Sequence, residues 1–296
     1  GRAAVDMAYQ QPLWQYATRE PLKRDLPTPG REPGGNVNDA VVPFESYGVS
    51  HRGCVRQLNE DRFLMEPESG LWLVADGMGG HEAGEVASST IVENLATIGI
   101  ARSAPELLAR FKDRLERAHE QIRALAKTRG VTIGSTVAAL LAMNGSFACF
   151  WSGDSRVYLV RGGRISQISR DHTEVQELLD KGVISPADAR NWPRRNVITR
   201  AVGVTDEIVV DFHQGRTEPG DVFVLSTDGL SAHVEDAEIG EAVAAYTPQA
   251  ACERLLEMVL GRGGTDNVTI VLVCMRGEAK PELSEVTAVP LGGERQ

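Results

Sequence analysis

The chain alternates between short apolar runs and turns rich in glycine and asparagine, a pattern typical of buried β-strands. The first such runs are residues 46–50, 62–66 and 71–75, each of strand length and each bounded by polar or turn-forming residues. The same criterion predicts further strands at 135–143, 146–152, 156–161, 164–168, 208–213, 221–226 and 267–275.

Two of the turns indicate how these strands pair. Asn144-Gly145 and Gly162-Gly163 each separate two apolar runs by only two residues. Two-residue connections of this composition form tight hairpins with a type I′ or II′ turn. Hairpins join antiparallel strands, so the pattern argues against a doubly wound parallel sheet.

Helices are predicted before and after the dense run of strands. In the longest of them, apolar residues recur at steps of three and four, at Leu108, Phe111, Leu115, Ala118, Ile122 and Leu125. This spacing places them on one helical face, which we interpret as the face that packs on a sheet. The helices are expected at 84–98, 104–127, 235–245 and 248–260.

The order of these elements predicts an α+β fold with an antiparallel β-sandwich core, flanked by helices on both outer faces. We expect the domain to span residues 44–276, with an irregular insertion of short helices and loop at 172–200. Residues 1–43 contain six prolines and no sustained periodicity, which indicates a flexible or loosely docked extension. Residues 277–296 also lack a period, and we expect a disordered tail.

Composition narrows the classes of partner. The 296 residues carry a formal net charge of −10, which disfavours a nucleic-acid partner and an anionic membrane surface. No apolar stretch is long enough to cross a bilayer, and the first residues lack the apolar core of a signal peptide. The four cysteines show no regular spacing, and two of them lie in apolar strand-like runs. A reducing, cytoplasmic location is therefore expected.

Acidic residues recur where apolar runs begin or end. Asp76, Asp154 and Asp228 follow such runs, Asp266 precedes the last one, and the pair Glu60-Asp61 precedes the run 62–66. A single aspartate of this kind is usually a turn residue. Several of them at the ends of different strands can converge on one edge of a sandwich, and carboxylates are the ligands that Mg²⁺ and Mn²⁺ prefer.

These segments resemble the metal-dependent protein serine/threonine phosphatases of type 2C, in their bacterial form. The matching stretches occur in family order between residues 46 and 275. They are VRQLNED at 55–61, VADGMGGHEAGEVAS at 74–88, GST at 134–136, SGDSRVYLVRGG at 152–163, SRDHT at 169–173, NVITRAVG at 196–203, DVFVLSTDGL at 221–230 and GGTDNVTIVLV at 263–273.

The resemblance implies a role for each of the acidic positions. It implies that Asp76 bridges two Mn²⁺ or Mg²⁺ ions, with Asp228 and Asp266 completing the ligands of one ion and the Gly77 carbonyl binding the other. Glu60 and Asp61 match a pair that holds metal-bound waters, and Asp154 matches a residue that helps to bind a third, weaker metal. Arg56 matches the arginine that clamps the substrate phosphate, a role suited to a guanidinium.

The general acid is the one position where the sequence departs from the wider family. Eukaryotic relatives carry a histidine directly after the first Asp-Gly, and this chain has Met78 there. His81 lies three residues further on and is an alternative, as is a metal-bound water. His172 falls at the start of the 172–200 insertion, which corresponds to the family's flap, and we expect it to order the base of that flap.

The resemblance implies an enzyme that hydrolyses phosphoserine and phosphothreonine in proteins through a water activated by two metal ions. Its expected partners are phosphoproteins and a cognate bacterial serine/threonine kinase that it opposes. The sequence offers no C-x₅-R loop or D-x-D-x-T motif for a covalent phosphoenzyme. Two alternatives remain open: a catalytically inactive relative that binds phosphoproteins, and a two-metal phosphatase for a small phosphate ester.

Overall fold

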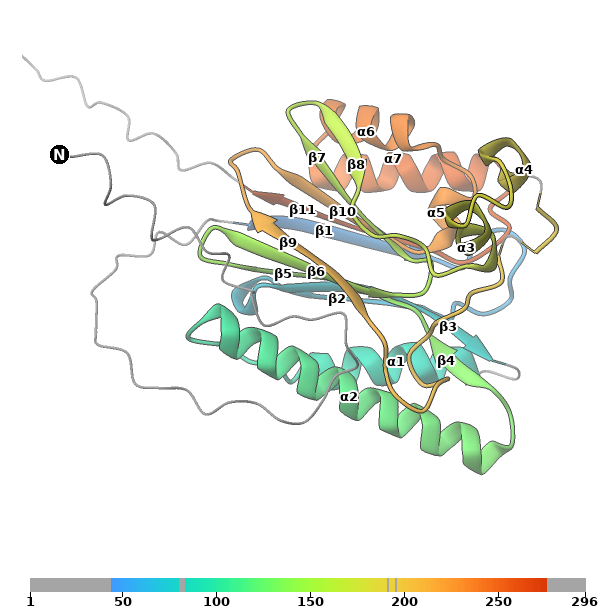
Figure 1. The fold of residues 1–296 in the computed structure, drawn as a ribbon. Coiled ribbons are helices and arrows are strands. Elements are labelled where there is room, and N and C mark those ends of the chain that lie inside the picture. The colour runs from blue at the N-terminus through green and yellow to red at the C-terminus, as the bar shows by residue number, and fades with distance from the viewer. Residues whose placement is uncertain (1–43, 80–82, 191, 195, 276–296) are drawn as a thin grey trace, which may run out of the picture.

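The computed structural model describes residues 44–79, 83–190, 192–194 and 196–275 (Figure 1). Its strands are β1 (Phe44–His51), β2 (Asp61–Glu66), β3 (Leu71–Gly79), β4 (Ile133–Ser135), β5 (Val137–Met143), β6 (Ser146–Ser152), β7 (Arg156–Arg161), β8 (Arg164–Gln167), β9 (Asp211–Arg216), β10 (Val222–Ser226) and β11 (Val268–Met275). Its α-helices are α1 (Ala83–Leu95), α2 (Ala104–Arg129), α3 (Glu174–Asp180), α4 (Pro186–Arg190), α5 (Asp228–Ser231), α6 (Asp236–Ala245) and α7 (Pro248–Gly261).

The strands form two antiparallel sheets that stack face to face, as Figure 1 shows. One sheet has the order β1-β11-β10-β7-β8, and the other has the order β2-β3-β5-β6-β9, with β4 paired to β3. Helices α1 and α2 cover the outer face of the second sheet, and α6 and α7 cover the outer face of the first. The predicted fold class, a sandwich with helices on both outer faces, is confirmed.

Three apolar layers hold the sandwich together. The central layer lies between the sheets and contains Trp72, Phe147 and Phe223, all at most 2% exposed. The two outer layers lie between each sheet and its helices, and the stripe predicted on α2 forms part of one of them. Burial of apolar surface at about 25 cal/mol per Å² makes these layers the main source of stability.

Local sequence rules explain several of the boundaries. In α2, Ser103 caps the first turn by accepting a hydrogen bond from the Glu106 amide, and Gly130 ends the helix in the left-handed conformation. The two predicted hairpins are confirmed, since Met143 pairs with Ser146 and Arg161 pairs with Arg164. Asn144 is the one described non-glycine residue with a positive φ, as a type I′ turn requires.

Three strand predictions need correction. The run 71–75 does not end at Asp76, because Gly77–Gly79 pair with Ile133–Ser135 and extend β3 beyond it. The run 135–143 is two strands, interrupted at Thr136. The run 208–213 becomes a strand only at Asp211, since Ile208 and Val210 are buried against the helical layer rather than in a ladder. The short helix α5 was not predicted.

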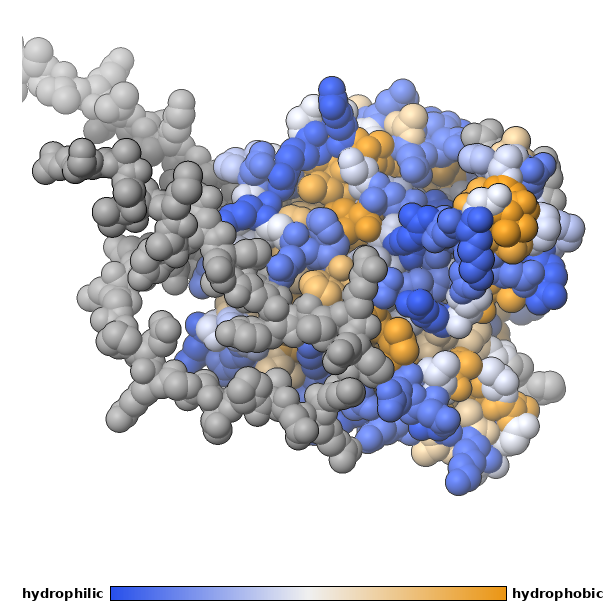
Figure 2. Space-filling model, viewed as in Figure 1, coloured by the Kyte–Doolittle hydropathy of each residue, from blue (hydrophilic) through white to orange (hydrophobic). Residues whose placement is uncertain are grey.

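The expected insertion at 172–200 contains α3 and α4, and a bridge between Thr173 and Ile198 joins its two ends. On the face drawn in Figure 2, hydrophilic residues predominate and hydrophobic ones appear as separate patches. Among the described helices, none has the length and apolar character needed to cross a bilayer. The predicted extension at 1–43 and tail at 277–296 lie outside the described residues.

Candidate metal centre

Two of the predicted carboxylates are brought together by strand pairing. Asp61 is the first residue of β2, and the antiparallel register places it directly opposite Asp76 on β3. Side chains of directly opposed residues project from the same face of a sheet, about 5 Å apart at Cβ. The β2–β3 ladder therefore sets two like charges side by side.

The side chain of Asp61 is held from the neighbouring sheet. Thr227 and Thr269 each donate a hydroxyl hydrogen bond of 2.8 Å to Asp61 Oδ2. Asp61 is only 1% exposed, and its Oδ1 has no hydrogen-bond partner. Burial raises the pKa of Asp61 to about 7, the two hydroxyls act to lower it, and the charges of Asp228 and Asp266 act to raise it.

Asp76 is fixed by its backbone. Its amide donates to Thr136 Oγ1 at 3.0 Å, and its carbonyl accepts from the Thr136 amide at 2.8 Å and from Ser135 Oγ at 2.9 Å. Burial raises the pKa of the Asp76 carboxyl well above its ordinary value, and the neighbouring charges of Asp61, Asp228, Asp154 and Asp266 raise it further. The carboxyl group thus lies at the centre of the acidic cluster.

Asp154 and Asp228 complete the inner side of the cluster. Asp154 follows β6, and burial with the charges of Asp228 and Asp171 raises its pKa to about 8. Asp228 begins α5, and burial and the charge of Asp266 raise its pKa to about 6, against the lowering effect of Arg56 and Arg156. Asp228 Oδ1 is buried without a hydrogen-bond partner.

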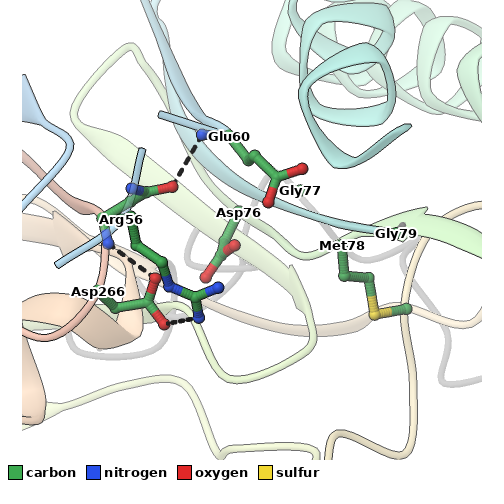
Figure 3. A pocket seen from close by; sticks show the side chains of 8 residues that line it. Arg56, Glu60, Asp76, Gly77, Met78, Gly79 and Asp266 are labelled. Carbon is green, nitrogen blue, oxygen red and sulfur yellow. Dashed lines mark hydrogen bonds and ion pairs between the residues drawn. The ribbon is translucent and has the colours of Figure 1, made fainter. Parts of the chain in front are cut away.

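Arg56 and Asp266 form an ion pair at the outer side. The guanidinium of Arg56 lies 2.7 Å from Asp266 Oδ2, and both side chains are partly exposed, at 53% and 35% (Figure 3). Asn267 connects this edge to Glu60. Its backbone amide donates to Asp266 Oδ1, and its side-chain Oδ1 accepts a hydrogen bond from the backbone amide of Glu60, each at 2.8 Å. Figure 3 places the Asp76 carboxylate between this pair and Glu60.

Glu60 and Gly77 meet the start of α1. Burial raises the pKa of the Glu60 carboxyl, and this outweighs the lowering effects of the Arg56 charge and of hydrogen bonds from the backbone amides of Glu85 and Gly84. A Cβ on Gly84 would lie 2.5 Å from Glu60 Oε1 and 2.6 Å from the Gly77 carbonyl oxygen. Only glycine at this position leaves room for both oxygens, which keeps the Gly77 carbonyl beside the acidic cluster.

These groups line a cavity of about 210 Å³, formed by Arg56, Glu60, Asp76, Gly77, Met78, Gly79, Asp266 and Asn267. Ligand pockets for whole small molecules are typically about 300–1,000 Å³, so this cavity suits a compact charged group. Met78 lies at its far side, away from the carboxylates in Figure 3.

The donor set fits a divalent cation in its chemistry. Several carboxyl groups with raised pKa values and two buried carboxylate oxygens without partners are what a hard cation would compensate. As positioned, however, no group of three or more histidine, cysteine, aspartate or glutamate side chains in the described part of the chain could hold a metal ion. Asp266 is instead paired with Arg56, and Asp61 with two threonines.

All eight predicted site residues therefore lie in one region. His81 lies outside the described residues. His172 is buried, accepts a hydrogen bond from the Gly153 amide at 3.2 Å and lies 3.3 Å from Asp211, which agrees with a structural role at the base of the insertion. Sequence reasoning missed the residues that orient the carboxylates, namely Thr136, Thr227, Asn267 and Thr269.

Solved structures that share this two-sheet sandwich are serine/threonine phosphatases, and comparison of the sequence identifies the family. The sequence model of the protein phosphatase 2C family matches residues 47–262. The chain belongs to this family, as the resemblance of its motifs predicted.

Named relatives agree with this assignment. The serine/threonine protein phosphatase PstP of Mycobacterium tuberculosis is 37% identical over 226 residues, which cover 75% of this chain and 43% of PstP. The structure of PppA, a key regulatory component of T6SS in Pseudomonas aeruginosa, is 42% identical and covers 78% of this chain and 97% of that chain, with a TM-score of 0.73. The catalytic domain of PstP in complex with two manganese ions is 34% identical and covers 79% of this chain and 99% of that one, with a TM-score of 0.72. The chain thus spans less than half the length of full PstP.

Proposed function

We propose that this protein is a metal-dependent phosphatase that hydrolyses phosphoserine and phosphothreonine in proteins. The observation that carries the proposal is the cluster of Asp61, Asp76, Asp154 and Asp228 at one end of the sandwich, whose pKa values are raised chiefly by burial and further by neighbouring carboxylates. Such a concentration of negative charge is costly unless cations bind to it. Manganese in the related catalytic domain of PstP supports the same chemistry here.

Each residue has a proposed role. Asp76, Asp228, Asp266 and the Gly77 carbonyl would hold two Mn²⁺ or Mg²⁺ ions, and Asp154 would help to hold a third. When bound, such ions would lower the pKa of water enough to make it a nucleophile at neutral pH. Glu60 and Asp61 would accept hydrogen bonds from water at the centre and orient it.

Arg56 is the proposed phosphate-binding residue. Its guanidinium lines the same cavity as Asp76, is half exposed and carries donors that match phosphate oxygens in pairs. It would have to leave Asp266 to do so, because the two are paired in this structure. A dianionic phosphate competes well for a guanidinium at an exposed position, where an ion pair contributes only about 0–1 kcal/mol.

The surroundings of the cavity favour a polypeptide substrate. Val55 and Leu58, which flank the cavity-lining Arg56 closely in the chain, are 61% and 43% exposed. Exposed apolar side chains near a small charged cavity suit a phosphorylated segment of a protein better than a fully enclosed metabolite. The cellular partners we propose are phosphoproteins and the kinase that phosphorylates them, in a reducing cytoplasm.

The test is hydrolysis of a phosphothreonine peptide with Mn²⁺ and with a chelator. We expect turnover with Mn²⁺, loss of turnover to background on chelation, and a higher kcat/KM for the peptide than for a nucleoside monophosphate. A variant that removes a carboxylate elsewhere, Asp113→Asn on the exposed side of α2, should leave turnover with Mn²⁺ unchanged.

Each alternative has its own signature in this assay. Absence of turnover with Mn²⁺ would favour the inactive, phosphoprotein-binding relative. A higher kcat/KM for the nucleotide would favour the small-ester phosphatase. Peptide hydrolysis that persists in the chelator would contradict metal dependence.

A further inference from the structure

His119 is a buried histidine that the proposed mechanism does not use. It lies on α2, is 1% exposed, and its Nδ1 accepts a hydrogen bond of 2.9 Å from the Gly203 amide. Burial and the nearby charge of Arg123 lower the pKa of the imidazole, against the raising effect of Glu120 and the backbone at Thr205 and Asp206. The ring is therefore neutral at physiological pH, and its Nδ1 lone pair is available to the amide.

The backbone at Gly203 is pressed against α2. Gly203 has a φ of +91°, and a Cβ there would lie 2.2 Å from Ile122 Cγ2. Arg123, one turn after His119, donates to the Asp206 carbonyl at 3.0 Å and forms an ion pair with its carboxylate. In Figure 1 the segment that leads into β9 descends to α2 and β4, in agreement with these contacts.

The same segment connects through Ser135 to the backbone of Asp76. Val202 and Ser135 exchange two backbone hydrogen bonds, of 2.8 and 3.0 Å. Ser135 Oγ then donates to the Asp76 carbonyl at 2.9 Å, and the next residue, Thr136, bonds to both the amide and the carbonyl of Asp76. Three consecutive contacts thus lead from the imidazole on the outer helix to the central aspartate of the cluster.

We propose that His119 is a positioning residue for Asp76, acting through Gly203, Val202 and Ser135. The inference rests on the proposed metal centre, because a fixed Asp76 matters most if Asp76 binds metal. Side chains that orient a metal ligand from behind affect metal affinity even though they never touch the ion. A histidine that served only to fill space on α2 would affect stability and leave metal affinity unchanged.

Two variants separate these roles. His119→Leu removes the acceptor and leaves the buried Gly203 amide unpaired, whereas His119→Asn places its Oδ1 at the position of Nδ1 and can keep the bond. Val259→Ala, in the apolar layer under α7 on the opposite face of the sandwich, is the control for general loss of stability. All three are made in the full chain and measured at a temperature where each stays folded.

Mn²⁺ binding is measured by calorimetry, and amide hydrogen exchange is measured on the metal-free proteins. We expect His119→Leu to raise the Kd for Mn²⁺ by about threefold to tenfold, somewhat less than is usual for direct partners of ligands. Exchange should become faster in residues 133–137 and at Asp76. His119→Asn should stay close to the unmodified protein in both measurements, and Val259→Ala should leave the Kd unchanged.

The inference is overturned if His119→Leu leaves the Kd and the exchange of residues 133–137 unchanged, or if Val259→Ala raises the Kd equally. If the unmodified protein bound no Mn²⁺, the proposed function would fail instead. The exchange measurement would then still decide whether His119 fixes the backbone of Asp76.

Discussion

Asp76→Asn is expected to abolish metal-dependent hydrolysis and at the same time to stabilise the metal-free protein. Loss of the bridging carboxylate removes several kcal/mol of transition-state stabilisation, so kcat/KM should fall by about 10³-fold or more. The asparagine also removes a carboxyl group whose ionisation is opposed by burial and by repulsion from the charges of Asp61, Asp228, Asp154 and Asp266. Relief of this repulsion should raise the Tm of the metal-free variant by a few degrees.

A buried carboxylate outside the cluster provides the control. Asp221 is 1% exposed and is bound by Arg161 at 2.6 and 2.7 Å, at the end of β10 opposite Asp228. Asp221→Asn should lower the Tm, because it weakens a satisfied ion pair, and should leave kcat/KM nearly unchanged. Kinetics and thermal unfolding of both variants are the measurements. An Asp76→Asn protein that retains activity, or that is destabilised as Asp221→Asn is, would contradict the account.

The affinity for Mn²⁺ is expected to fall steeply as the pH decreases from 8 to 6. The carboxyl groups of Asp154, Asp61 and Asp228 have pKa values of about 8, 7 and 6 in the metal-free protein, chiefly because they are buried. A cation must displace the protons that these groups hold. Displacement of one to two protons makes the Kd at pH 6 roughly 10²-fold or more higher than at pH 8.

Stability of the metal-free protein should follow the opposite trend. Since the three pKa values are raised above the ordinary aspartate value, the folded state binds protons that the unfolded chain has lost. Their contribution to stability is therefore fully present below the ordinary aspartate pKa of 3.8, and it is lost progressively as the pH rises from there through the folded-state values of about 6 to 8. Calorimetry in buffers of different ionisation enthalpy counts the protons released per ion, and chemical unfolding measures the stability. Binding without proton release, at an affinity independent of pH, would show that the carboxylates are not the ligands.

The fold could be predicted because its signals are local. Hairpins at Asn144-Gly145 and Gly162-Gly163 and the apolar stripe of α2 depend on residues close together in the chain. The extension of β3 beyond Asp76 could not be predicted in this way, since Gly77–Gly79 have no strand propensity and are strand only because β4 pairs with them. Likewise, Ile208 and Val210 are buried in the apolar layer between the second sheet and its helices, and they do not pair in a β-ladder.

The candidate site was predictable in part for the same reason. Its aspartates stand next to apolar strands, and the family motifs surround them. Their partners carry no local signal: Thr227 and Thr269 lie 166 and 208 residues from the carboxylate that they bind. The ion pair between Arg56 and Asp266 joins residues 210 positions apart, and no periodicity in the sequence indicates that they meet.

The most direct test of the metal centre is diffraction from crystals of the full chain grown with Mn²⁺, using the anomalous signal of manganese. We expect two peaks about 3.5–4 Å apart, with Asp76 between them, Asp228 and Asp266 on one ion, and Arg56 released from Asp266. Manganese bound elsewhere, or an Asp76 carboxylate that contacts no ion while Arg56 stays paired with Asp266, would contradict this expectation.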